Sequence, residues 1–405
     1  MRTLRRRVFS TLCLLGGATL LGCASDAPPG DASLDVATDL PATEAATPAD
    51  VPDAADVTDA ADAADVTAVT DVRDAADVTA PDPLASLRAC LGTTAPLTIS
   101  HQVPYVSVPI GADRGEFALD YGTTFSSIDL AAFPAPGPRT SGCDRTRLGV
   151  TCTVEGFSFF ADPSPVSLVT QDFRAITGTV RQAGIIGTDF TSLRVIALSY
   201  SASRLFVSTA TRCADEAWRA AGFASLTSRG FFSNDLGALS PMSAVDASAA
   251  AGARVPNVPT VPVRVGGASA LAQLDTGFDD ALVPFSVNVN DAFYRAIMAS
   301  DVGALVRSAA RDLSLTTCVV GVSEPVEAYT LGPGRSLEFV SDSGAVARRY
   351  PGATLFVKRT PAAARSCGGI GTWTAPAAQV AASFFVEMGA LAFDPYASRV
   401  WVPAR

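Results

Sequence analysis

Short apolar runs separated by turn residues dominate positions 103 to 402 of the 405-residue chain. Many of the runs alternate apolar and polar positions with the two-residue period of a β-strand, and turn residues interrupt them at short intervals. A helical period is convincing only at residues 214–224 and 291–310. The folded part is therefore predicted to be all-β with a few short helices. The strands are expected at Tyr105–Ile110, Glu116–Asp120, Val150–Phe160, Val166–Phe173, Leu193–Tyr200, Arg204–Ser208, Val261–Val265, Ala270–Leu274, Ala281–Phe285, Thr316–Val322, Leu337–Val340, Thr354–Lys358, Ala390–Asp394 and Arg399–Val402.

Part of this pattern occurs twice, 155 residues apart and without a gap. Residues 103–111 lead to Leu119-Asp120-Tyr121-Gly122, and residues 258–266 lead to Leu274-Asp275-Thr276-Gly277. Each copy ends in an aspartate that follows an apolar strand, and the glycine two positions later permits a tight turn. The repeat predicts two related halves, each of which contributes one carboxylate.

The first 22 residues predict an export signal. Four arginines precede an apolar run over residues 8–21, which is short for a membrane-spanning helix. The run ends in Leu20-Leu21-Gly22-Cys23, which resembles the lipobox of bacterial lipoproteins, where the cysteine becomes the lipidated N-terminus. The resemblance implies an anchor at Cys23 in the bacterial cell envelope. Because Ala24 and Ser25 follow instead of an aspartate, it implies the outer membrane. An ordinary signal peptide is the alternative.

Residues 23–84 have a different composition from the rest of the chain. They consist mostly of Ala, Asp, Val, Thr and Pro, and they contain no aromatic residue. Such a segment is predicted to be a disordered linker because it cannot bury enough apolar surface. Fifteen acidic residues and one arginine between Asp26 and Asp82 give −14, and the four arginines of the signal give +4, so these two segments account for the whole net charge of −10. The folded part is therefore nearly neutral, and we expect no nucleic-acid partner.

Cysteine usage predicts disulfides. Six cysteines follow the lipobox, and an even number in an exported chain favours pairing. Sequence alone leaves fifteen possible connectivities open. Pairing near neighbours first gives Cys143–Cys152, Cys318–Cys367 and Cys90–Cys213. No CxxC spacing occurs, so we expect no metal site.

The inventory of reactive side chains excludes several kinds of enzyme. The chain has a single histidine, His101, so multi-histidine metal sites are ruled out, and the histidine is interpreted as an ordinary polar residue. There is no GxSxG turn, no GxGxxG pattern and no P-loop, which removes the usual signals for a serine hydrolase or a nucleotide cofactor. We expect no cofactor.

Carboxylate chemistry remains. Two carboxylates that face each other cannot both ionise easily, so they share one proton. The ionised partner can then activate a water while the protonated partner polarises a carbonyl group. Asp120 and Asp275 are the candidates because they occupy matched positions in the two halves.

Three segments resemble the pepsin-like and retropepsin-like aspartic proteases. The first is the pair Phe117–Thr124 and Ala272–Phe278, which contain the two Asp-x-Gly turns. The second is Gly184-Ile-Ile-Gly187, similar to the segment that packs beneath the aspartate loop in that family, with Ile186 and Gly187 as its key residues. The third is the ending, Phe384 to Val402. The resemblance covers most of residues 97–405 and implies a bilobal β fold with Asp120 and Asp275 at the floor of a cleft.

The chain departs from the family pattern around these aspartates. Thr276 fits the hydroxyl residue expected after each aspartate, whereas Tyr121 does not. Thr123 fits the hydroxyl residue expected after each glycine, whereas Phe278 does not. Ala382 stands where the family has a supporting glycine in the second half. Gly122 and Gly277 themselves are both present.

The sequence therefore predicts a lipid-anchored aspartic endopeptidase that hydrolyses polypeptides and acts as a monomer. The alternative is a catalytically degenerate surface lipoprotein that binds a peptide or protein in its cleft. A flap is expected within residues 143–160. The expected organisation is a signal peptide at 1–22, a linker at 23–84, an N-terminal β lobe at 85–212, a helix and connection at 213–254, and a C-terminal β lobe at 255–405.

Overall fold

A computed structural model describes residues 82–174, 178–228, 258–317 and 319–404. The predicted signal peptide, Cys23, nearly all of the predicted linker and most of the predicted connection lie outside these ranges. No helix in the described ranges has the length and apolar character needed to cross a bilayer. The folded segment begins earlier than residue 85, because Leu84 is fully buried and the Asp82 carboxylate accepts a hydrogen bond from Ser199 Oγ at 2.7 Å.

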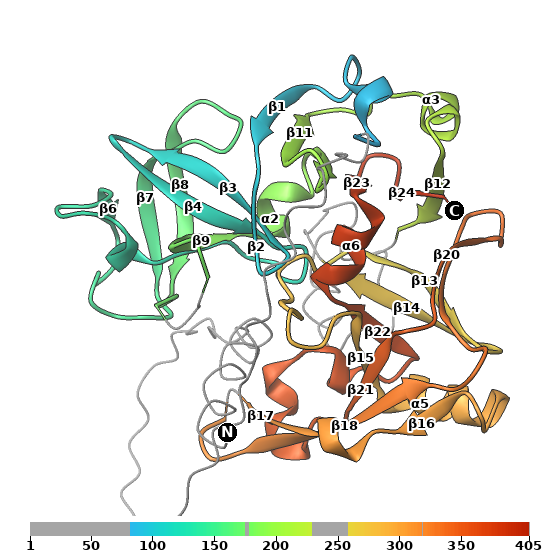
Figure 1. The fold of residues 1–405 in the computed structure, drawn as a ribbon. Coiled ribbons are helices and arrows are strands. Elements are labelled where there is room, and N and C mark those ends of the chain that lie inside the picture. Colours follow the sequence, from blue (N-terminus) through green and yellow to red (C-terminus); the bar gives the residue numbers. More distant parts are fainter. Residues whose placement is uncertain (1–81, 175–177, 229–257, 318, 405) are drawn as a thin grey trace, which may run out of the picture. The chain divides into compact units, whose positions relative to one another are not determined.

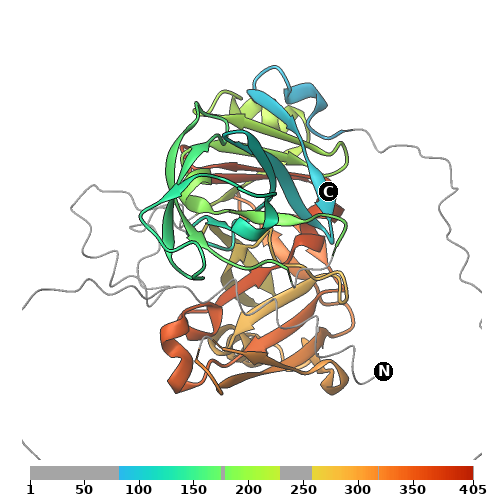
Figure 2. The ribbon, with the colours of Figure 1, turned by 90° about the vertical axis from the view of Figure 1, so that its left-hand side faces the viewer.

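Three β-sheets account for the strands of the described residues, so the all-β prediction is confirmed. The eight-stranded sheet belongs to the first half of the chain, and its strands group together in Figure 2. In spatial order it contains β2 (Thr98–Ser100), β3 (Val103–Ile110), β4 (Asp113–Leu119), β9 (Gln182–Ile186), β5 (Ser127–Ile128), β8 (Ser164–Thr170), β7 (Thr151–Phe157) and β6 (Thr140–Ser141).

The ten-stranded sheet belongs to the second half. In spatial order it contains β16 (Leu305–Arg307), β18 (Ser323–Leu331), β21 (Thr354–Lys358), β15 (Ser286–Asn290), β22 (Ala377–Val380), β14 (Ala268–Leu274), β13 (Thr260–Val265), β19 (Leu337–Val340) and β20 (Val346–Tyr350), with β17 (Leu313–Thr316) paired to β18.

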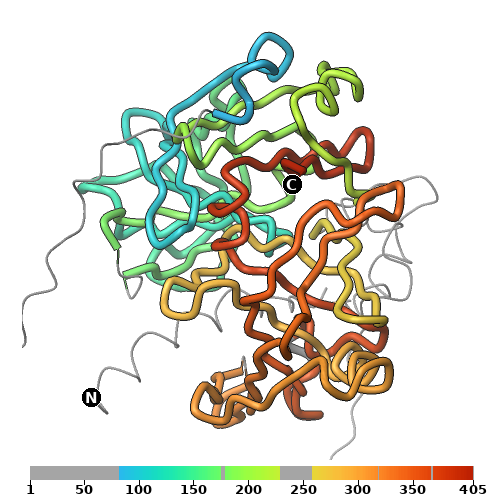
Figure 3. The backbone as a smooth tube through the Cα atoms, turned by 45° about the vertical axis from the view of Figure 1, so that its right-hand side comes forward, coloured from blue at the N-terminus to red at the C-terminus, as the bar shows by residue number. Residues whose placement is uncertain are grey.

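The six-stranded sheet combines both halves of the chain. Its spatial order is β1 (Thr93–Pro96), β11 (Arg204–Ser208), β10 (Val195–Ser199), β23 (Ala390–Asp394), β24 (Arg399–Pro403) and β12 (Phe223–Thr227). The C-terminal strands β23 and β24 thus lie between β10 and β12, in a sheet whose other strands all precede residue 228 (Figure 1). The backbone trace in Figure 3 shows the same adjacency of the red C-terminal segment and the green strands.

The α-helices of the described residues are short: α2 (Thr188–Thr191), α3 (Asp215–Ala220), α5 (Asp291–Ser300) and α6 (Ala382–Met388). Helix α5 begins where the Asn290 side chain accepts a hydrogen bond from Phe293 N at 2.9 Å, as expected of an N-cap. Phe293 and Ile297, four residues apart on one face, are fully buried. Short 3-10 turns complete the helical residues at Ala85–Leu87, Leu130–Ala132, Ala309–Arg311, Ala362–Cys367 and Ile370–Thr372.

The duplicated segments form the same structure twice. In the first half β3 and β4 make a hairpin, and β4 then pairs in parallel with β9. In the second half β13 and β14 make a hairpin, and β14 pairs in parallel with β22. Each aspartate follows the second strand of its hairpin, so the repeat read from the sequence corresponds to a repeat in strand pairing.

Three sequence predictions are wrong. Residues 281–285 form turns, and the strand follows at β15, because the Asp280 carboxylate accepts from Ser286 N at 3.0 Å and closes the turn. The helix predicted to reach residue 310 ends at Ser300, since Asp301 is extended and Leu305–Arg307 pairs with β18. The strand predicted over 316–322 ends at Thr316, where β17 stops pairing with β18.

Two of the predicted disulfides are confirmed. Cys90 pairs with Cys213, and Cys143 pairs with Cys152. The first links the segment before β1 to the segment before α3. The predicted Cys318–Cys367 pair involves Cys318, which lies outside the described residues.

Candidate active site

The two aspartates occupy equivalent backbone positions. Asp120 follows β4, and its N–H donates to Ile186 O at 3.0 Å. Asp275 follows β14, and its N–H donates to Val380 O at 3.1 Å. Both carboxyl groups are buried, since Asp120 is 1% exposed and Asp275 is 5% exposed. The strand ends therefore bring two carboxylates out of water at matched points of the two sheets.

In each aspartate loop the glycine N–H donates to the carboxylate of the same loop, and the glycine backbone lies against the carboxyl of the other loop. Gly122 N donates to Asp120 Oδ1 at 2.6 Å, and Gly277 N donates to Asp275 Oδ1 at 3.0 Å. A methyl group built on Gly122 would overlap the Asp275 carboxyl, and one built on Gly277 would overlap the Asp120 carboxyl. Glycine is required at both positions because the opposite carboxyl lies against its backbone.

The two carboxyl groups lie close enough for each to influence the ionisation of the other. Burial raises the pKa of Asp120, against hydrogen bonds from Gly122 N–H and the Asp275 carboxyl that lower it. Burial likewise raises the pKa of Asp275, and the neighbouring Asp120 charge adds to the rise. Two like charges this close cannot both persist, so the pair holds one proton over a wide pH range.

A single hydroxyl connects the two loops. Thr276 Oγ1 donates to Leu119 O at 2.6 Å and accepts from Tyr121 N at 3.1 Å. All three residues are buried at 1% exposure or less. Thr276 therefore holds the end of β4 and the first turn of the opposite loop.

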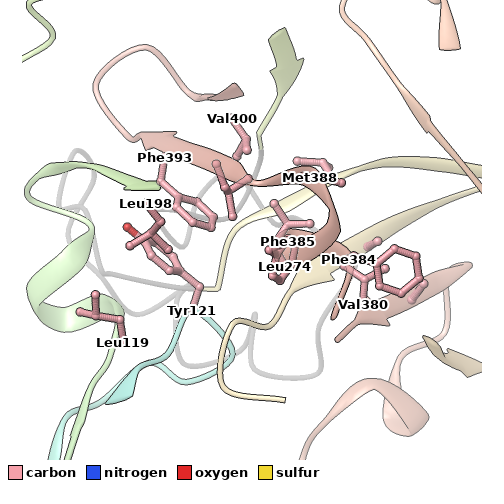
Figure 4. Packing of buried hydrophobic residues seen from close by; sticks show 14 of the residues in the cluster. Leu119, Tyr121, Leu198, Leu274, Val380, Phe384, Phe385, Met388, Phe393 and Val400 are labelled. Atoms are coloured by element: carbon pink, nitrogen blue, oxygen red, sulfur yellow. The ribbon is translucent and has the colours of Figure 1, made fainter. Parts of the chain in front are cut away.

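Tyr121, the first departure from the family pattern, points away from the carboxylates. Its ring is fully buried and stacks on Phe393 of β23, with centroids 3.5 Å apart and planes 10° apart. Figure 4 shows the ring next to Phe393 and Leu198, and all three belong to the same buried cluster. The bulky side chain is thus accommodated in the core, and the loop keeps its hydrogen bond to Thr276.

The residues after the two glycines do not bond the carboxylates with their side chains. Thr123 Oγ1 donates to Phe125 O at 3.4 Å, and Phe278 is a buried apolar side chain. Asp275 instead receives a side-chain donor from another strand, because Gln379 Nε2 lies 2.6 Å from Asp275 Oδ2. Gln379 was missed from the sequence, although it is the one polar residue in the apolar run Ala377–Val380.

The supporting segments beneath the loops are also equivalent, with one correction. Thr188 N donates to Thr123 O, and Ala382 N donates to Phe278 O, both at 3.0 Å. Ala382 therefore corresponds to Thr188, and the residue equivalent to Gly187 is Ala381. The sequence interpretation was off by one position because Val380-Ala-Ala382 offers two small residues. Ile186 O accepts the Asp120 N–H, and a methyl group on Gly187 would meet the backbone of Phe125.

Each aspartate loop is joined to its supporting segment by an aspartate–serine hydrogen bond. The serine is on the loop side in the first half, and the aspartate is on the loop side in the second half. In the first half, the Ser126 hydroxyl donates to Asp189 Oδ1 at 2.7 Å. In the second half, the Ser383 hydroxyl donates to Asp280 Oδ2 at 2.5 Å. Burial raises the pKa of Asp189, and it raises the pKa of Asp280 to about 6. No short motif marks these four residues, because each contact joins positions at least 60 residues apart.

His101 lies close to the site without contacting the pair. Its Nδ1 is 3.2 Å from the carboxylate of Asp279, which is exposed on the same loop as Asp275. The predicted flap region contributes β7, whose Phe157 packs against Phe117 with centroids 5.7 Å apart.

The described ranges contain no group of three or more His, Cys, Asp or Glu side chains that could hold a metal ion. The sequence matches no protein-family model, and no curated protein is significantly similar to it. The arrangement of Asp120 and Asp275 is therefore the main guide to function.

Proposed function

We propose that this protein is an aspartic endopeptidase that hydrolyses polypeptides with a water activated by Asp120 and Asp275. One observation carries the proposal: two buried carboxyl groups, each lying against the glycine of the opposite loop. A structural ion pair would need a cation here, and no Lys, Arg or His side chain of the described residues forms a salt bridge with either carboxyl; the side-chain donor on Asp275 is the neutral Gln379. Burying two acidic side chains together costs free energy, and ionisable groups in such costly surroundings cluster at functional sites.

The reaction needs one proton on the pair. The ionised carboxylate removes a proton from water as the water oxygen attacks the peptide carbonyl carbon, while the protonated carboxyl donates to the carbonyl oxygen. The resulting tetrahedral diol collapses when a proton passes to the amide nitrogen and the C–N bond breaks. The pair returns to its singly protonated state, and no covalent intermediate forms. The raised pKa values favour this state under mildly acidic conditions.

The wider architecture is part of the proposal. The eight-stranded and ten-stranded sheets would be the two lobes of a pepsin-like or retropepsin-like fold, with polypeptide bound between them. The backbone equivalence of the two aspartate loops supports this assignment. We further propose that the signal and Cys23 anchor the domain to the cell envelope, with residues 24–81 as a spacer.

The test compares two neighbouring aspartates. Asp275→Asn should abolish cleavage of an unstructured polypeptide such as reduced casein, while Asp279→Asn should retain it, since Asp279 is exposed and outside the pair. Circular dichroism and thermal melting would establish that both variants fold. Full activity in folded Asp275→Asn would exclude the pair as the catalytic group.

Cleavage and peptide-binding assays on the same purified protein test the non-catalytic alternative. A protein that only binds peptides would cleave nothing between pH 3 and 7, yet would retain a peptide on a sizing column. The sequence arguments for this alternative were Tyr121, Phe278 and Ala382. The argument from Tyr121 is weakened because the ring lies on Phe393 and the loop keeps its bond to Thr276.

A further inference from the structure

One side-chain contact distinguishes Asp275 from Asp120. Gln379 Nε2 donates to Asp275 Oδ2 at 2.6 Å, and Asn288 Nδ2 donates to Gln379 Oε1 at 2.8 Å. The two amides face each other directly across β15 and β22. Because Asn288 occupies the glutamine oxygen, the glutamine presents its N–H group to the carboxylate.

The equivalent positions in the first half cannot make this contact. Ile186 and Val380 both accept the aspartate N–H, so the residues before them, Ile185 and Gln379, correspond. Strand β5 places Ser127 opposite Ile185, as β15 places Asn288 opposite Gln379. Ile185 is apolar and 2% exposed. The amide pair is therefore confined to the Asp275 side.

An N–H donor acts differently on the two states of a carboxyl group. It stabilises a charged oxygen and opposes a hydrogen on that same oxygen. Asp275 Oδ1 already accepts from Gly277 N, so Gln379 gives the second oxygen its own donor. The contact lowers the pKa of Asp275, although burial and Asp120 outweigh it.

The geometry points to Gln379, oriented by Asn288, as a positioning residue that keeps Asp275 Oδ2 unprotonated and so confines the shared proton to the other oxygens of the pair. The inference rests on the proposed function and deepens it. It assigns the two aspartates unequal surroundings, and it predicts that the lower of the two ionisations occurs at a lower pH than without the amide.

Other titratable groups near the pair are few among the described residues. Asp280 and Asp279 follow on the same loop, the first held by Ser383 and Ser286 and the second beside His101. Burial raises the pKa of Tyr105 of β3, and the nearby charges of Asp279 and Asp120 add to the rise. Strands β15 and β22 contribute the uncharged amides of Asn288 and Gln379. None of these groups is altered by a change at Gln379.

The test titrates the carboxyl groups directly in the full-length protein. Carbon-13 NMR of aspartate-labelled protein follows both carboxyls, with Asp120→Asn and Asp275→Asn used for assignment. Gln379→Leu should raise the lower apparent pKa of the pair by about one unit, the size of one hydrogen bond to a charged group. Asn288→Leu should shift it in the same direction by less. In the cleavage assay, the acidic limb of kcat/KM should move to higher pH by the same amount.

Gln182→Leu is the matched control. Gln182 is a buried glutamine at the start of β9 that bonds Tyr105 Oη, so its loss should leave both aspartate titrations in place. An unchanged or lowered pKa in Gln379→Leu would overturn the inference, because the amide would then not be donating to Asp275. If Gln379→Leu does not fold, an unmoved titration in Asn288→Leu has the same meaning. A raised pKa without cleavage at any pH would refute the peptidase proposal and leave the positioning role intact.

Discussion

The Asp120 loop and the Asp275 loop share a backbone and differ in almost every supporting side chain. The Asp120 loop is held by a hydroxyl from the opposite loop and by a ring stacked on β23. The Asp275 loop supplies that hydroxyl and receives an amide on its carboxylate. Main-chain hydrogen bonds therefore set the symmetry of the site, and side chains can distribute the remaining support unequally.

The largest expected effect comes from making the loops alike. Tyr121→Thr would restore a hydroxyl residue at this position but remove a fully buried ring, leaving a cavity against Phe393. We expect a loss of about 3–5 kcal/mol in the free energy of unfolding, measured by urea denaturation. Tyr121→Phe keeps the stacking and should stay within about 1 kcal/mol of the native protein. A stable, fully active Tyr121→Thr would show that the ring is dispensable.

The next effect tests whether one hydroxyl serves both loops. Thr276→Val has nearly the same volume but leaves Leu119 O and Tyr121 N without their partner. Two buried groups left unpaired should lower the free energy of unfolding by about 3 kcal/mol. Thr276→Ser retains the hydroxyl and should lose much less. Equal stability of the valine and serine variants would argue against the link.

Substitutions of Gly122 and Gly277 test the feature that the two loops share, which is the close approach of each glycine to the opposite carboxyl. Gly122→Ala and Gly277→Ala each push a methyl group into the opposite carboxyl. A displacement of about 1 Å costs about 100-fold in rate, so both variants should lose kcat/KM to a similar degree. Gly352→Ala is the control, since a methyl group there meets nothing within 4 Å. A large loss in only one of the two glycine variants would break the symmetry.

The smallest effect concerns the exchanged aspartate–serine contacts. The pKa of Asp280 is raised to about 6, so its ionisation destabilises the fold as the pH rises from about 4 through 6. Relative to Asp280→Asn, the native protein should lose about 1–3 kcal/mol of unfolding free energy between pH 4 and 7. Asp172 gives the opposite sign: its pKa is lowered to about 2 by Arg174, so its contribution is present above pH 4 and disappears toward pH 2. Parallel pH dependence of native protein and Asp280→Asn would contradict the assignment.

The sequence predicted the parts of this molecule that depend on local pattern. Strands such as β11, β19, β21 and β23 have the expected bounds because apolar alternation and turn residues determine them locally. Asp120 and Asp275 were found because the repeat places each in the same strand–turn context. The catalytic use of these residues stays a prediction until cleavage is measured.

The remaining features depend on contacts between distant segments. Residues 281–285 resemble a strand, but Asp280 closes a turn there through Ser286 and the distant Ser383. Gln379 contacts Asp275 across 104 residues of sequence, and Tyr121 meets Phe393 only because β23 joins β10. Such partners become visible once sheet order is known.

The placement of β23 has a consequence for synthesis of the chain. This strand is joined to β10 on one side and to β24 on the other, so the sheet that receives Tyr121 is completed only by residues 390–403. A ribosome delivers those residues after every other strand of the same sheet. The amino-terminal half, although made earlier, cannot complete its core until β23 and β24 have emerged.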